Sequence, residues 1–182
     1  MLRSLVLIPV LTIGLVIPAI AQEKAYLPMS GSFRLHTGWK LVGDTTKITN
    51  KLTYGSGSIW GVAYNDAGSG PLHMGAVVCT DAYEVIEGVS ASQGKCAWSD
   101  ADGDRLFTDW SGKGASTSTS DFVGMNTITG GTGKFNGIQG KAPFQCKPLN
   151  DQGQLSCMQQ FEYEITLERS GTTTPPSTTQ SK

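Results

Sequence analysis

The clearest pattern in the chain is a strict alternation of apolar and polar residues near its end. Within residues 155–168, four apolar side chains are each separated by a charged or polar residue: Phe161, Tyr163, Ile165 and Leu167. Side chains alternate between the two faces of a β-strand, so a period of two predicts a strand with one buried face. The segment from Gly31 repeats this pattern, with Phe33, Leu35, Trp39 and Leu41 on one face.

Shorter runs of strand-forming residues lie between turn signals. Residues 58–64 and 73–80 are rich in β-branched and aromatic residues, which favour strands. The Asp-Gly step at 102–103 predicts a hairpin that joins strands at 95–99 and 105–111. We interpret residues 55–57 as a turn and residues 112–120, which are small and polar, as a loop. Further strands are predicted at 47–54, 83–89, 121–129 and 142–147.

This succession of short strands indicates an all-β fold. The chain contains 23 glycines and has no helix-length apolar pattern after its first residues. Roughly eight to ten strands with regular turn signals are typical of a barrel or a sandwich. A single antiparallel barrel, closed or nearly closed, is favoured because closure removes exposed strand edges. A sandwich is the alternative.

A glycine-rich corner at residues 127–147 organises the second half of the chain. Its glycines permit a path that leaves one strand, turns twice and enters another. The corner lacks a phosphate-binding motif, because Gly133-Lys134 is followed by Phe135 where that motif has Ser or Thr. Nucleotide binding is therefore not expected here.

The run G-G-T-G-K-F-N-G-I-Q-G at residues 130–140 resembles the corner of allene oxide cyclase-like barrels. The upstream run C-A-W-S-D-A-D-G-D at 96–104 is similar to bacterial members of that group. The resemblance covers roughly the second half of the mature chain and implies a small antiparallel barrel, related in shape to dirigent proteins and lipocalin-like containers. It implies no particular reaction, because no catalytic residue of the family's plant enzymes can be matched to this sequence.

The termini differ in character from the predicted barrel. Residues 1–21 have a basic Arg3, an apolar core and an Ala19-Ile20-Ala21 cleavage pattern, which predicts a secretory signal peptide. An uncleaved anchor is the alternative, but Pro9, Gly14 and Pro18 interrupt the apolar run. The expected organisation is then a lead-in at 22–30, a barrel at 31–169 and a disordered Ser/Thr/Pro-rich tail at 170–182. The mature protein is expected in the periplasm or outside the cell, with no membrane segment.

Charge and side-chain inventory exclude several classes of partner. The formal net charge is −1 and the basic residues are scattered, which predicts no nucleic-acid partner. His36 and His73 are the only histidines, so a three-histidine metal site is excluded. Asp100, Asp102 and Asp104 lack the spacing of a calcium loop and are interpreted as a hairpin turn. We expect no metal and no cofactor.

The four cysteines predict two disulfides in an exported chain. Cys146 and Cys157 flank a turn-rich segment that would place them opposite each other in a hairpin. We therefore favour pairing Cys146 with Cys157, which leaves Cys79 with Cys96.

A barrel of this size can enclose one small apolar molecule. The ring-bearing residues proposed to line such a site are Trp39, Trp60, Tyr64, Tyr83 and Trp110, with Phe33 as a further candidate. The same rings would equally fill a packed core. Three functions stay open: a small-molecule binding protein, a cyclase or isomerase, and a packed barrel that acts through its surface. The groups that would support the enzyme are Glu84, Glu87, Asp109 and Tyr163.

Overall fold

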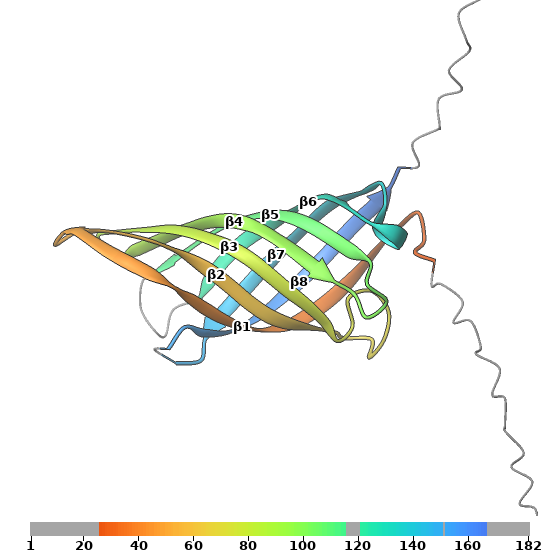
Figure 1. The fold of residues 1–182 in the computed structure, drawn as a ribbon, viewed down its shortest axis with the longest axis horizontal. Coiled ribbons are helices and arrows are strands. Elements are labelled where there is room, and N and C mark those ends of the chain that lie inside the picture. Colours follow the sequence, from red (N-terminus) through yellow and green to blue (C-terminus); the bar gives the residue numbers. More distant parts are fainter. Residues whose placement is uncertain (1–25, 116–120, 151, 167–182) are drawn as a thin grey trace, which may run out of the picture.

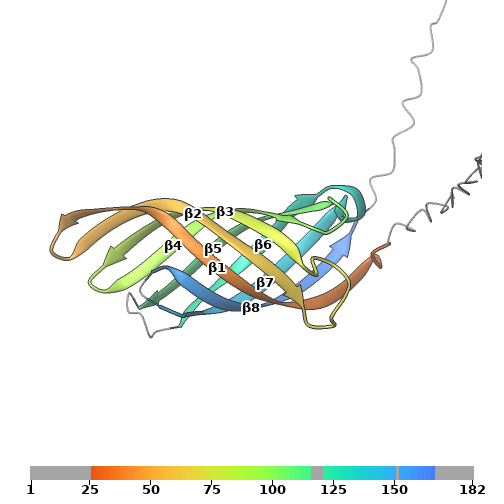
Figure 2. The same ribbon diagram turned by 60° about the horizontal axis from the view of Figure 1, so that its bottom comes forward.

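The computed structural model is a closed barrel of eight antiparallel strands (Figures 1 and 2). The structure describes residues 26–115, 121–150 and 152–166. Each strand pairs with its neighbour in sequence, and the last strand pairs with the first. The strands are β1 (Ser30–Thr49), β2 (Leu52–Asn65), β3 (Gly75–Ile86), β4 (Val89–Ser99), β5 (Arg105–Ala115), β6 (Phe122–Gly131), β7 (Ile138–Pro148) and β8 (Gln154–Ile165). The predicted all-β barrel is confirmed.

The predicted segments at the two ends fall mostly outside this description. The signal peptide at 1–21 and the tail at 170–182 lie outside the described residues, as does Leu167 of the last predicted strand. Within the described residues, no helix has the length and hydropathy needed to cross a bilayer.

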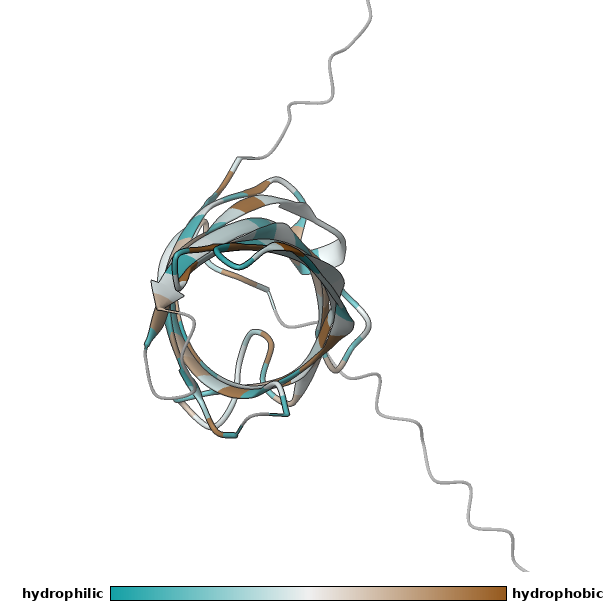
Figure 3. Cartoon of the chain, turned by 90° about the vertical axis from the view of Figure 1, so that its left-hand side faces the viewer, coloured by the Kyte–Doolittle hydropathy of each residue, from teal (hydrophilic) through white to brown (hydrophobic). Residues whose placement is uncertain are grey.

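On β1 and β8 the wall places apolar residues inside and polar residues outside, as the alternation predicts. On β1, Leu35 is fully buried while its neighbours Arg34 and His36 are exposed. On β8, Phe161 and Tyr163 are buried between exposed Glu162 and Glu164. Figure 3 looks along the barrel and shows the strands as a continuous ring.

Three glycine-rich or polar segments form strands where the sequence analysis predicts otherwise. Residues 55–57, interpreted as a turn, lie within β2, and the chain reverses at residues 50–51 instead. Residues 112–115, assigned to a loop, complete β5, and residues 90–94, left without an element, belong to β4. The reason is that neighbouring strands lie too close together for a side chain at these glycines. A Cβ at Gly57 would lie 2.4 Å from the backbone oxygen of Val42, so the close approach of β1 and β2 requires glycine.

The glycine-rich corner closes one end of the barrel (Figure 1). Between β6 and β7 the chain makes a single 3-10 turn, η1 (Gly133–Phe135), with Gly133 and Gly137 at φ values of 57° and 75°. Glycine adopts such positive φ values without steric cost. Phe135 of this turn is fully buried and joins the core with Leu27, Leu72 and other residues of this end.

The acidic turn between β4 and β5 packs against the same corner. The ammonium group of Lys134 lies 2.8 Å from a carboxylate oxygen of both Asp100 and Asp102. Burial alone would lower the pKa of Lys134, but these two hydrogen bonds raise it above its ordinary value. Asp104 accepts a hydrogen bond from the backbone N–H of Lys134. The aspartates therefore hold the corner against the hairpin.

Candidate functional site: a cavity at the mouth of the barrel

The other end of the barrel holds a cavity of about 460 Å³. It reaches the end of the barrel where the chain passes from β3 to β4 and from β7 to β8, and we call this end the mouth. All eight strands contribute lining side chains. The interior is therefore packed at the corner end and hollow at the mouth, which differs from the packed barrel weighed in the sequence analysis.

A line of hydrogen-bonded polar side chains forms the floor of the cavity. Trp98 Nε1 donates to Thr108 Oγ1 at 3.0 Å, and Thr108 Oγ1 donates to Asn126 Oδ1 at 3.1 Å. Asn126 Nδ2 then donates to Gln159 Oε1 at 2.9 Å, and Gln159 Nε2 donates to Thr37 Oγ1 at 3.1 Å. All five residues are buried. Because buried polar groups are costly unless paired, this line fixes the rotamers of the floor.

Among the described residues, six aromatic residues line the cavity. All of them except Trp98 lie opposite a glycine of an adjacent strand. Five cavity rings have a glycine directly across the strand pair: Trp39 with Gly61, Tyr83 with Gly55, Trp110 with Gly94, Phe122 with Gly114 and Phe144 with Gly124. A Cβ on the glycine would approach the facing ring to between 2.2 and 3.2 Å in all five pairs. The missing side chains let the rings lie against the wall, so the lumen stays open.

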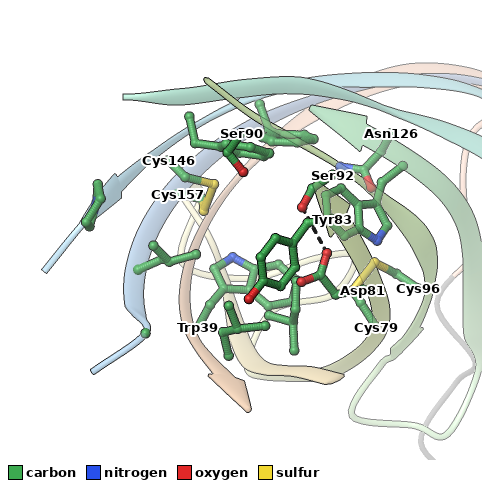
Figure 4. A pocket seen from close by; sticks show the side chains of 18 of the residues that line it. Trp39, Cys79, Asp81, Tyr83, Ser90, Ser92, Cys96, Asn126, Cys146 and Cys157 are labelled. Carbon is green, nitrogen blue, oxygen red and sulfur yellow. Dashed lines mark hydrogen bonds between the residues drawn. A yellow bond between two sulfur atoms is a disulfide. The ribbon is translucent and has the colours of Figure 1, made fainter. Parts of the chain in front are cut away.

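Both disulfides lie on the inner wall of the cavity (Figure 4). Cys79 pairs with Cys96 across β3 and β4, and Cys146 pairs with Cys157 across β7 and β8. The predicted pairing is confirmed. In a ring of eight strands these two strand pairs lie opposite each other. Each disulfide therefore cross-links the two strands on its own side of the mouth.

Among the residues that the structure describes, one carboxyl group faces this apolar space. Asp81 is 6% exposed, and its Oδ1 accepts a hydrogen bond of 3.0 Å from Ser92 Oγ. Burial raises the pKa of Asp81 above its ordinary value, and the hydrogen bond from Ser92 offsets part of that rise. The hydroxyl of Tyr83, two residues along β3, shares a hydrogen bond with Thr45. Figure 4 shows Asp81, Ser92 and Tyr83 gathered on one side of the cavity.

The structure brings three of the five predicted aromatic residues to the cavity. Trp39, Tyr83 and Trp110 line it. Trp60 and Tyr64 lie on the outer face, 55% and 51% exposed, because β2 places its even-numbered residues outside. Residues 58–64 are apolar on both faces, so their hydropathy could not show which face is buried. Phe33 stacks on Phe161 at a ring-centroid distance of 4.9 Å, outside the cavity lining.

The four groups named for an enzyme do not reach the cavity. Glu87 and Asp109 form ion pairs on the exposed surface with Lys51 and Lys95. Glu84 lies on the outer face of β3, opposite exposed Tyr54. Tyr163 is buried and inward, but it packs against Phe33 away from the cavity. Burial raises the pKa of Tyr163.

The sequence analysis missed Asp81, although its position contains the signal. Asp81 lies two residues after Cys79 and two before Tyr83. A disulfide cysteine and a candidate lining residue at this spacing place Asp81 on the same inward face. The floor residues Asn126 and Gln159 gave no such signal, because isolated polar residues in a strand are usually solvated. In comparisons with known proteins, no family model, curated protein or solved structure matches this chain.

Proposed function

We propose that the protein is an exported barrel that binds a small apolar molecule in the mouth cavity. The observation that carries the proposal is the set of rings held flat over glycines, because it keeps the lumen open and apolar. The cavity volume of about 460 Å³ falls within the range of roughly 300–1,000 Å³ found for small-molecule sites. The polar floor and the carboxyl group of Asp81 would orient a bound molecule.

Two features support the export part of the proposal. The two disulfides fit an oxidising compartment, where such bonds form and persist. The first 21 residues have the composition of a secretory signal. We also propose a relationship to the allene oxide cyclase-like barrels, on the resemblance of the corner sequence at residues 130–140.

A titration with a neutral fluorescent dye, N-phenylnaphthylamine, tests the proposal. The emission of this dye rises when it leaves water for an apolar site. We expect saturable binding of one dye per chain. Replacing Ile59, which lines the cavity, by Trp should fill part of the lumen and weaken binding at least about tenfold, or roughly 1.4 kcal/mol.

The matched control is Ser56→Trp, which places the same ring on the exposed outer face of the same strand. Its dye affinity should equal that of the unaltered protein. Equal affinities for Ile59→Trp and the unaltered protein, or no saturable binding at all, would reject a ligand site in the lumen.

A cyclase or isomerase is the second candidate, and Asp81 is the observation that favours it. Burial raises the pKa of the Asp81 carboxyl, and a carboxyl with a raised pKa is better suited to proton transfer than a solvated one. Tyr83 supplies a hydroxyl in the same cavity. Compounds that co-purify with the protein can be identified by mass spectrometry and then incubated with it. An isomerase changes the connectivity of the compound at constant mass and loses that activity in Asp81→Asn, whereas a binding protein returns it unchanged.

A further inference from the structure

Asp81 is the one carboxyl group among the described residues that line the cavity. Among the described residues, the hydrogen-bond partner of the Asp81 side chain is Ser92, whose hydroxyl donates to one carboxylate oxygen of Asp81. The other oxygen has no protein partner in the described part of the chain. The described residues that line the cavity include no lysine, arginine or histidine.

The protein compensates the negative charge of an ionised Asp81 only in part. A carboxylate removed from water is costly unless a cation or several donors compensate it. The hydroxyl of Ser92 supplies one donor, which favours the ionised form. A cationic group that enters the cavity would supply the remaining compensation and keep Asp81 ionised.

The walls around Asp81 suit a cation on an apolar skeleton. Tyr83 lies on the same strand, and Trp39 and Trp110 line the same cavity. The faces of such rings attract ammonium groups by cation–π interactions while they pack against hydrocarbon. An anionic ligand would instead meet a carboxyl group with no cation beside it.

We propose that the ligand is a primary or secondary amine on an apolar skeleton, with its protonated nitrogen bound by Asp81. This inference rests on the proposed function and names the chemical class that the cavity selects. Tyr83 is the only other titratable group that lines the cavity within the described residues, and β2 and β4 present none beside Asp81. The ionisation of Asp81 therefore controls amine selection, and protonation of Asp81 removes it.

Competition against N-phenylnaphthylamine with three matched compounds tests the proposal. Naphthylmethylamine, naphthylmethanol and naphthoate share one ring system and differ in charge. At pH 7 the amine should displace the dye at a concentration about tenfold lower than the alcohol, a preference expected for a charge-assisted hydrogen bond. Naphthoate should be the weakest competitor.

Asp81→Asn should remove the preference for the amine and leave displacement by the alcohol unchanged. Asp44→Asn is the matched control, because Asp44 is an exposed carboxylate on the outer face of β1 near the mouth. It should retain the preference. In the unaltered protein, acidification that protonates Asp81 should also remove the preference, which tests the inference without any substitution.

The outcomes separate this inference from the function on which it rests. If the dye binds but the amine and alcohol compete equally, or the preference survives in Asp81→Asn, the amine proposal is wrong and the binding function stands. If the dye and all three compounds fail to bind, both are wrong.

Discussion

The indole of Trp110 lies over Gly94 and donates a hydrogen bond of 3.1 Å to the backbone oxygen of Thr80. A Cβ at position 94 would lie 1.9 Å from that oxygen and 2.6 Å from Trp110 Nε1. It would therefore sit between the donor and the acceptor. The hollow mouth depends on such pairs, in which one residue has a large ring and its neighbour has no side chain.

Gly94→Ala should accordingly displace Trp110 and break its hydrogen bond to Thr80. We expect a loss of about 2–4 kcal/mol in the free energy of unfolding, from overpacking and the broken bond together. Urea denaturation followed by tryptophan fluorescence measures this loss. The control is Gly38→Ala, where no atom lies within 4 Å of the added Cβ. The control should change stability by less than about 1 kcal/mol. Similar losses in both variants would contradict the role of Gly94.

Lys134→Met should destabilise the closed end of the barrel. The side chains of Lys134 and Asp100 are only 9% and 6% exposed, so the variant leaves a buried carboxylate without its cation. Breaking one partner of such a pair costs about 3 kcal/mol or more. The exposed Lys113 on β5 provides the control, and Lys113→Met should alter stability by less than about 0.5 kcal/mol. The double variant Lys134→Met with Asp100→Asn should recover part of the loss. If it does not, the ion pair is not the cause.

The stability of the protein should depend on pH through Asp81. Burial raises the pKa of Asp81, so the folded state binds its proton more tightly than the unfolded chain does. The contribution of Asp81 is therefore favourable below its unfolded pKa of about 3.9 and is lost as the pH rises through the folded pKa. Asp81→Asn removes this titration. Relative to the unaltered protein, the variant should gain stability between pH 3 and pH 7, as measured by thermal or urea denaturation at both values. A variant that loses relative stability over that interval would contradict the buried, desolvated state of Asp81.

Each disulfide should stabilise the barrel by restricting the unfolded chain. The cysteines are separated by 17 and 11 residues, for which loop-closure entropy gives about 3 kcal/mol each. Replacing both Cys146 and Cys157 by Ala should lower the free energy of unfolding by about that amount. A reductant should then destabilise this variant further through Cys79–Cys96. No change on removing Cys146–Cys157 would show that the hairpin is already fixed without its bond.

The sequence predicted the wall of the barrel better than its lumen. Hydropathy alternation identified β8 and β1, and the spacing of Cys146 and Cys157 around a turn identified their pairing. Hydropathy does not report how closely two strands approach each other. The inward glycines at 55, 57, 112 and 114 therefore resembled turns and loops. The role of Gly94 requires the register that places Trp110 opposite it.

The candidate site was predicted only in part for a related reason. Trp39, Tyr83 and Trp110 have polar or small neighbours that mark one face, whereas Trp60 lies in a run that is apolar on both faces. Asp81 resembled a solvated residue until its neighbours in β3 fixed its direction. Side chains from eight strands meet in one cavity because the ring of strands closes. The sequence of a single strand does not show that closure.

The most direct test of the central claim is a crystal structure of the protein grown with N-phenylnaphthylamine. The account predicts electron density for the dye inside the mouth, in contact with Trp39, Tyr83 and Trp110 and above Asn126 and Gln159. A lumen filled by those three rings, with the dye absent or bound on the outer face near Trp60, would contradict it.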